Sequence, residues 1–174
     1  VPYKRIDLAV CAYSRAGRKL KIAGAGSERN RLAALAGPSV EFLGRLPDSD
    51  LLTLYRRCRA LVFPGEEDFG IVPVEAMACG RPVIAYGRGG VTETVVPGTT
   101  GVLFPDQTEQ ALLDAVDQAD ARRWDPEAIR AQAERFSEAA FVAGLDASIH
   151  ACLAPPDRSR PPIRKNNQGE STRP

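Results

Sequence analysis

The segment PGEEDFGIVPVEAMACG, residues 64–80, decides the fold of this chain. It follows the apolar run 60–63, which predicts a buried strand, and it changes near Ile71 to a pattern typical of a helix. Pro73 suits the first helical turn, where a missing backbone N–H costs nothing, and Gly80 can adopt the left-handed conformation that ends a helix. The segment therefore predicts a strand, a loop and a helix, with the loop at the carboxyl edge of a parallel sheet.

The same alternation extends over residues 1–153. Short apolar runs predict strands at 20–23, 40–43, 60–63, 82–85 and 101–104. Helical stripes lie between them, one formed by Ile6, Ala9, Val10 and Tyr13 and another by Leu51, Leu54, Tyr55 and Cys58. Side chains of Asp48 or Ser49, and the pair Asp106 and Glu109, are expected to cap two of the helices. The predicted fold class is α/β, with a Rossmann-like, doubly wound parallel sheet. Because such a sheet would open with a strand, we also expect one before Val1.

Composition bounds the domain and its partners. The chain has 174 residues, enough for one globular domain, which we assign to residues 1–153. Two final helices are expected to use Phe136, Phe141, Val142, Leu145 and Ile149 as their apolar side. Residues 154–174 hold five of the 14 prolines and almost no apolar side chains, which predicts a disordered tail. With 23 basic and 22 acidic residues, the chain has no general electrostatic attraction for nucleic acid or an anionic membrane.

The sequence lacks the residues that metal sites, redox dithiols and Ser-His-Asp triads usually need. The four cysteines include no C-x-x-C pair, and we expect them to be small buried apolar side chains. One histidine cannot support a zinc site or a Ser-His-Asp triad, so we predict no metal and no cofactor. No apolar run approaches the ~18 residues of a membrane span. We therefore expect a cytoplasmic protein, peripheral to a membrane only through regions outside this chain.

The loop at 65–70 has the makings of an anion site. Backbone N–H groups near the helix start, around Phe69 to Val72, have no partner within the helix and suit a phosphate. Glu67 and Glu75 lie on either side of this helix start. Carboxylates beside a bound anion are unfavourable unless they accept hydrogen bonds from hydroxyl groups of the ligand. A sugar nucleotide offers both chemistries. The alternative is a solvated acidic loop, with Glu75 merely complementing the helix dipole.

Glu67 and Glu75, with seven residues between them, resemble the E-x7-E signature of family 4 retaining glycosyltransferases, which have the two-domain GT-B fold. The runs 76–85, 89–93 and 98–104 are also similar to that family, as are 1–7, 22–26 and 40–44. The resemblance covers roughly residues 1–150. It implies that the chain is the donor-binding, Rossmann-like half of such an enzyme, and that the acceptor domain is a partner region outside this sequence.

The resemblance also implies roles for individual positions. Glu67 and the backbone of Asp68, Phe69 and Gly70 would hold the transferred sugar, and Glu75 would bind the ribose hydroxyls. Lys4 would neutralise the leaving diphosphate, which makes Glu67 and Lys4 the candidate catalytic residues. The remaining candidate donor-binding positions are Ile71 and Val72, whose amides would meet the distal phosphate, Gly24, and, bordering the nucleobase, Gly44, Arg45 and Leu51.

The predicted activity is transfer of a hexose from a nucleoside-diphosphate sugar to a saccharide or lipid-linked acceptor. Similarity to members that use a mannose donor in polysaccharide assembly makes GDP-mannose a candidate donor. Two alternatives stay open: a nucleotide-sugar epimerase of GT-B fold, which needs no acceptor domain, and a non-catalytic nucleotide-sugar-binding module. On the first reading, this chain alone binds a donor and does not transfer it.

Overall fold

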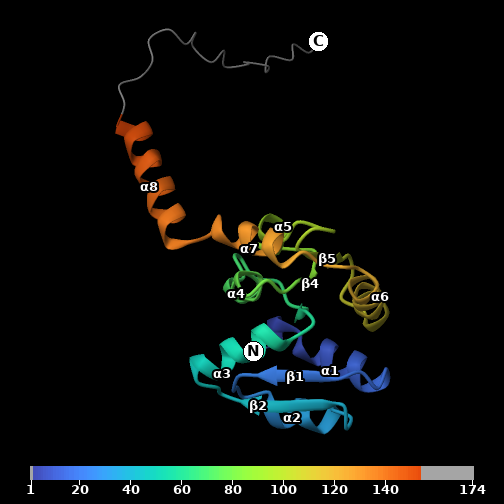
Figure 1. Ribbon diagram of the computed structural model, residues 1–174. Coiled ribbons are helices and arrows are strands. Elements are labelled where there is room, and N and C mark those ends of the chain that lie inside the picture. The colour runs from blue at the N-terminus through green and yellow to red at the C-terminus, as the bar shows by residue number, and fades with distance from the viewer. Residues whose placement is uncertain (1, 154–174) are drawn as a thin grey trace, which may run out of the picture.

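The computed structural model describes residues 2–153 and shows a two-part α/β body from which one helix projects (Figure 1). A 3₁₀ turn at Pro2–Lys4 opens the chain. The strands are β1 (Leu20–Ala23), β2 (Val40–Gly44), β3 (Leu61–Phe63), β4 (Val83–Tyr86) and β5 (Gly101–Phe104). The helices are α1 (Ile6–Arg15), α2 (Arg29–Leu35), α3 (Asp48–Arg57), α4 (Ile71–Ala78), α5 (Val91–Thr94), α6 (Glu109–Asp120), α7 (Pro126–Glu134) and α8 (Glu138–Leu153). All five predicted strands form, and the α/β class is confirmed. The predicted tail lies outside the described residues.

Every strand pairing is parallel, as predicted. β1 pairs with β2, and β4 lies between β3 and β5. Within residues 2–153 the strands form two sheets rather than one, because β1 and β3 share no ladder and each keeps an unpaired edge. The parallel order still places the carboxyl ends of β3, β4 and β5 at one edge, where the loops that follow these strands gather.

Helices cover both faces of the β3–β4–β5 sheet. Successive β4 side chains point to opposite faces, so Ile84 enters one core while Val83 and Ala85 enter the other. The first core joins α1 and α6 to the sheet, and the second joins α4 and α7 to it. Trp124, the only tryptophan, packs against both cores and donates its indole N–H to the Ala119 carbonyl at 3.0 Å. This two-sided cover is what doubly wound sheets require.

Two predicted helix caps are wrong. The cap of α6 is Thr108, whose hydroxyl accepts from the Ala111 N–H at 3.2 Å, rather than Asp106. α3 begins at Asp48 after Pro47 and has no side-chain cap, so Asp48 lies inside the first turn. There its carboxylate complements the helix dipole. The predicted end of α4 is confirmed, because Gly80 has φ 70° and its N–H donates to the Met77 carbonyl at 2.8 Å.

The apolar side of α8 exists but is not covered. The helix has no buried residue, and Phe141 and Val142 are 68% and 56% exposed. The helix leaves the body as a separate rod (Figure 1). Periodicity reveals an apolar side but not its partner, so the expectation that these residues pack is not met here. The cysteines likewise differ from expectation, since Cys152 is exposed and the other three are only half-buried.

None of the described helices is both long and apolar enough to cross a membrane.

Candidate functional site

Three loops meet closely at the carboxyl edge of the sheet. A Cβ added at Gly65 would lie 2.7 Å from the Lys4 Cα, so only glycine lets the loop after β3 reach the chain before α1. A Cβ at Gly90 would lie 2.5 Å from the Phe69 Cα, and the Gly90 N–H donates to the Glu67 carbonyl at 2.8 Å. The loop around Glu67 is therefore held between two other backbones.

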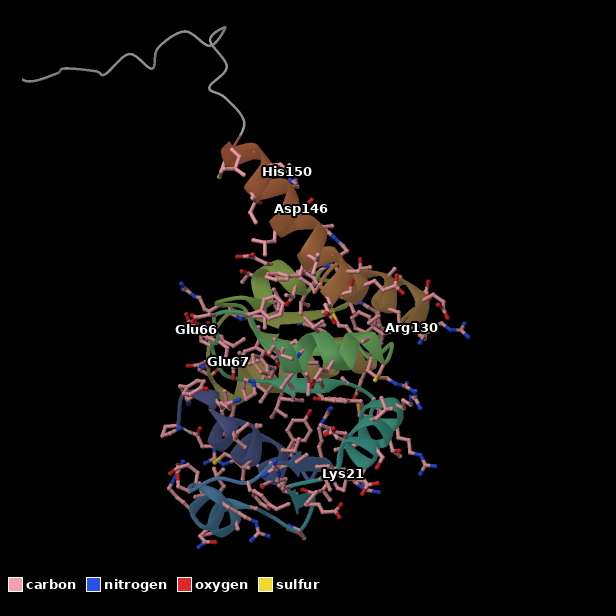
Figure 2. All side chains as sticks on the ribbon, turned by 90° about the vertical axis from the view of Figure 1, so that its left-hand side faces the viewer. Lys21, Glu66, Glu67, Arg130, Asp146 and His150 are labelled. Atoms are coloured by element: carbon pink, nitrogen blue, oxygen red, sulfur yellow. The ribbon has the colours of Figure 1, made fainter. Side chains whose placement is uncertain are left out.

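Lys4 and Glu67, the two candidate catalytic residues, lie together. The Lys4 ammonium is 3.0 Å from Glu67 Oε1, and the two side chains are 38% and 20% exposed. Glu67 Oε1 is buried and makes no hydrogen bond of good geometry among the described residues, so the ion pair with Lys4 is its compensation. Figure 2 shows Glu66 and Glu67 on one side of the body and Arg130 on the opposite side. The structure thus juxtaposes the pair, while their roles stay predictions.

The start of α4 presents backbone N–H groups. Gly70 precedes the helix with φ 79°, a left-handed conformation that favours glycine, and supplies no side-chain cap. Among residues 2–153, the N–H groups of Ile71 and Val72 find no acceptor. Free amides and the helix dipole together favour an anion at this point. The Ile71 side chain is 63% exposed, so the approach from outside is open.

Phe69 extends the loop toward the last helices. Its ring meets that of Phe136 edge-on, with centroids 5.8 Å apart, and Phe136 lies between α7 and α8. Asp68 beside it is exposed. The sequence placed Phe136 on an apolar helix side and gave no signal that it would support the loop.

Glu75 faces a different partner from Glu67. On the exposed surface of α4 its Oε2 accepts a hydrogen bond from the Tyr55 hydroxyl of α3 at 2.9 Å. Burial raises the pKa of Tyr55 above its usual range, and the hydrogen bond to Glu75 and its charge raise it further. Tyr55 was predicted only as part of an apolar stripe. A tyrosine on such a stripe needs a partner for its hydroxyl, which is the signal that could have found it.

The remaining candidate positions lie at the ends of β1 and β2 and on α3. The Gly24 N–H donates to the Gly44 carbonyl at 2.7 Å and ties these strand ends together. Arg45 is exposed and Leu51 is half-buried on α3. In the described part of the chain, no hydrogen bond or ion pair joins these four residues to the Glu67 loop. The candidate residues therefore form two groups, one around the Glu67 loop and one at the ends of β1 and β2 and on α3.

A series of hydrogen bonds that the sequence did not reveal holds the chain next to Lys4 in place. Arg5 adopts φ 48°, unusual for a residue with a side chain, and donates to Gln107 Oε1 at 2.9 Å. Gln107 in turn donates to the Pro64 carbonyl at 2.8 Å. These two hydrogen bonds connect the chain before α1 to the loop after β3 through the segment before α6.

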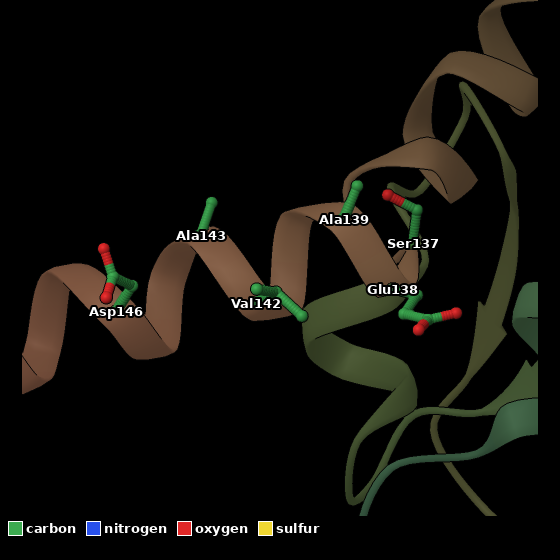
Figure 3. Close-up of a pocket in the computed structure, with 6 residues that line it drawn as sticks. All are labelled: Ser137, Glu138, Ala139, Val142, Ala143 and Asp146. Atoms are coloured by element: carbon green, nitrogen blue, oxygen red, sulfur yellow. The ribbon is translucent and has the colours of Figure 1, made fainter.

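A separate hollow lies beside α8. Figure 3 shows its lining, Ser137, Glu138, Ala139, Val142, Ala143 and Asp146, which includes none of the predicted site residues. The candidate site lies instead in the loops at the sheet edge. Residues 2–153 contain no group of three or more His, Cys, Asp or Glu placed to hold a metal ion. The prediction that no metal or cofactor is used stays a prediction.

A parallel α/β body with loops gathered at its strand ends defines a Rossmann-like domain. The chain belongs to the family described as glycosyl transferases group 1, whose model matches residues 1–140. It is 29% identical over 154 residues to an uncharacterized glycosyltransferase of Methanocaldococcus jannaschii, covering 83% of this chain and 44% of that protein. It is 51% identical over 69 residues to an alpha-1,3/1,6-mannosyltransferase of Neurospora crassa, covering 38% and 15% of the two chains.

Solved GT-B glycosyltransferases share the fold. The lipopolysaccharide outer core galactosyltransferase WaaB superposes with a TM-score of 0.76 at 19% identity, over 87% of this chain and 46% of that one. Anabaena HepE, in complex with UDP and glucose, superposes with a TM-score of 0.67 at 23% identity, over 88% and 46%. The chain thus spans less than half the length of these proteins. The predicted likeness to the GT-B fold is confirmed.

Proposed function

We propose that this chain is the donor-binding half of a retaining glycosyltransferase that takes a hexose from a nucleoside-diphosphate sugar. The acceptor is a saccharide or a lipid-linked saccharide, bound by a partner domain of the same enzyme. The observation that carries the proposal is the placement of the Lys4–Glu67 pair beside a helix start with free amides. The family match and the UDP held by HepE, a protein of the same fold, support a nucleotide sugar as the ligand class.

In this proposal the bond between the anomeric carbon and the diphosphate oxygen breaks, and its electron pair stays with the diphosphate. An acceptor hydroxyl oxygen forms the new bond to the anomeric carbon, and the proton of that hydroxyl passes to the departing diphosphate. Lys4 and the amides of Ile71 and Val72 stabilise that developing charge, because cationic and N–H groups held by the fold need little reorganisation during the reaction. Glu67 accepts from sugar hydroxyls, and Glu75 accepts from the ribose. No metal ion is required by these residues, and the enzyme works in the cytoplasm.

The identity of the sugar is a further part of the proposal. Mannose, carried as GDP-mannose, is supported by the 51% identity to a mannosyltransferase over 69 residues. An epimerase of the same fold stays an alternative, and it would interconvert nucleotide sugars without an acceptor. A non-catalytic binding module would bind the same donor with no turnover in the full-length protein.

Calorimetric titration of the 174-residue chain with UDP, GDP and ADP tests donor binding and names the base. We expect one of them to bind below millimolar, and Glu75→Ala to weaken it about tenfold, as loss of hydrogen bonds to a charged group predicts. Glu134→Ala, an exposed carboxylate on α7, is the matched control and should bind as the wild type does. Chelation with EDTA should not change the affinity. Binding of none of the three nucleotides would refute the proposal.

Catalysis is tested in the full-length enzyme. Lys4→Ala and Glu67→Ala should each lower the transfer rate, while Glu134→Ala should not. Transfer that is unaffected by either change would refute the assigned roles, and turnover without acceptor would favour the epimerase.

A further inference from the structure

Tyr55 makes the one side-chain hydrogen bond to Glu75 within residues 2–153. The Tyr55 hydroxyl lies 2.9 Å from Glu75 Oε2, and the two residues are 20 positions apart on α3 and α4. An exposed glutamate on a helix otherwise samples several rotamers, which costs entropy whenever a ligand fixes one of them. The bond from Tyr55 removes part of that freedom before any ligand arrives.

The Tyr55 hydroxyl has a defined position and a defined protonation state. The Tyr55 ring packs against the core that joins α4 and α7 to the sheet, so its hydroxyl has a defined position over α4. Burial, followed by the Glu75 hydrogen bond and charge, keeps the pKa of Tyr55 above its usual range. The phenol is therefore protonated at neutral pH, and toward a carboxylate it acts as a donor.

The geometry leaves Glu75 with acceptor capacity. An ionised carboxylate offers about four lone-pair sites on two oxygens, and Tyr55 uses one site on Oε2. Oε1 stays available to hydroxyl donors. Leu51, a candidate nucleobase neighbour, lies one turn before Tyr55 on the same half-buried face of α3. One helix face thus carries both the candidate base neighbour Leu51 and the tyrosine that bonds to Glu75.

We propose that Tyr55 is a positioning residue that orients the Glu75 carboxylate toward the ribose hydroxyls and so selects ribonucleotide over deoxyribonucleotide donors. The inference rests on the proposed function, in which Glu75 binds the ribose. Tyr55 itself does not touch the sugar; it acts through Glu75. Loss of its hydroxyl therefore weakens the recognition of ribose hydroxyls and leaves contacts to the base and diphosphate intact.

The test uses the 174-residue chain and the tightest binder among UDP, GDP and ADP, together with its 2′-deoxy and 3′-deoxy forms. In the wild type, we expect at least one deoxy form to bind tenfold or more weakly, about 1.4 kcal/mol. In Tyr55→Phe this ratio should fall to about threefold or less, with the affinity for that deoxy form unchanged within about twofold. A purely structural role would weaken all ligands alike.

Three further variants make the outcome decisive. Tyr13→Phe removes a phenolic hydroxyl from the buried face of α1 and should keep the wild-type ratio. Glu75→Ala should bring the ratio of the two affinities close to one. Adding Tyr55→Phe to Glu75→Ala should cause no further loss of nucleotide affinity. Thermal unfolding checks that each variant is folded.

The two proposals fail in different ways. A wild-type chain that binds no nucleotide overturns the proposed function and this inference with it. Binding by the wild type, with a ribose preference that Tyr55→Phe retains, overturns the inference alone.

Discussion

Lys4, at the end of the 3₁₀ turn, and Glu67, in the loop that leads into α4, neutralise each other, with Nζ and Oε1 3.0 Å apart. The two residues have opposite effects on the binding of a nucleoside diphosphate. A diphosphate needs the ammonium of Lys4, whereas the carboxylate of Glu67 both competes for that ammonium and repels the phosphate.

Glu67→Gln should therefore tighten binding of a nucleoside diphosphate that carries no sugar, by roughly two- to fivefold, while Lys4→Gln should weaken it about tenfold. Calorimetric titration measures both. The exposed pair Lys21 and Glu41, 3.5 Å apart on β1 and β2, gives the control, and Glu41→Gln should change nothing. Equal weakening by Glu67→Gln and Lys4→Gln would contradict this account.

Gly90→Ala should destabilise the fold by about 1–3 kcal/mol, because its new Cβ meets backbone that no rotamer change can move. Gly26→Ala is the matched control, since a Cβ at Gly26 meets nothing within 4 Å and its φ is not positive. Urea unfolding measures the two free energies. If both variants unfold alike, the backbones at Gly90 and at the Glu67 loop do not pack closely.

Phe136→Ala should lower stability by about 1 kcal/mol, the usual worth of an aromatic pair, and should speed amide exchange in the loop that holds Phe69. Phe141→Ala, whose ring is 68% exposed on α8, should stay within about 0.5 kcal/mol of the wild type. Chemical unfolding and hydrogen exchange provide the measurements. Unchanged exchange in Phe136→Ala would show that Phe69 does not depend on this contact.

Alkaline pH should destabilise the protein through Tyr13. Burial raises the pKa of Tyr13 from 10.0 to about 12, with Asp120 adding to the rise and Arg18 opposing it. The folded state holds the phenol proton more tightly than the unfolded state, so this stability is complete below pH 10 and is lost as pH rises from 10 to 12. The full shift corresponds to about 2.7 kcal/mol, and about 1.4 kcal/mol of it is lost by pH 11.

Tyr13→Phe should accordingly lose less stability than the wild type between pH 9 and pH 11, as measured by urea unfolding at each pH. Tyr3→Phe changes a tyrosine that is 54% exposed and should follow the wild-type pH profile. A Tyr13→Phe profile that matches the wild type would contradict the role assigned to Tyr13.

Much of the framework could be predicted because its signals are local. Short runs that are apolar apart from Lys21 in β1 and Glu41 in β2 marked all five strands, and the residues Pro73 and Gly80 located α4. The loop at 65–70 could be placed at the strand ends for the same reason, since parallel topology follows from the alternation of strands and helices.

The supporting contacts of the site could not be predicted, because they join residues far apart in the chain. Tyr55 and Glu75 are 20 residues apart, and Arg5 and Gln107 are 102 apart. No periodicity reports which hydroxyl meets which carboxylate. Phe136 and the exposed side of α8 show the same limit, because an apolar stripe does not name what packs against it. The cap of α6 could not be predicted because Asp106 and Thr108 both precede the helix and either side chain could have served. At α3 the helix begins one residue earlier than a cap at Asp48 requires, and no side chain caps it.

The position of Trp124 gives the protein a built-in optical reporter. Its single indole touches both cores, one on each face of the β3–β4–β5 sheet. Its fluorescence therefore responds when either face opens, with no label needed. A single emission transition that coincides with the loss of helical circular dichroism would mean that the two faces come apart together, and a biphasic one would mean that they separate in turn.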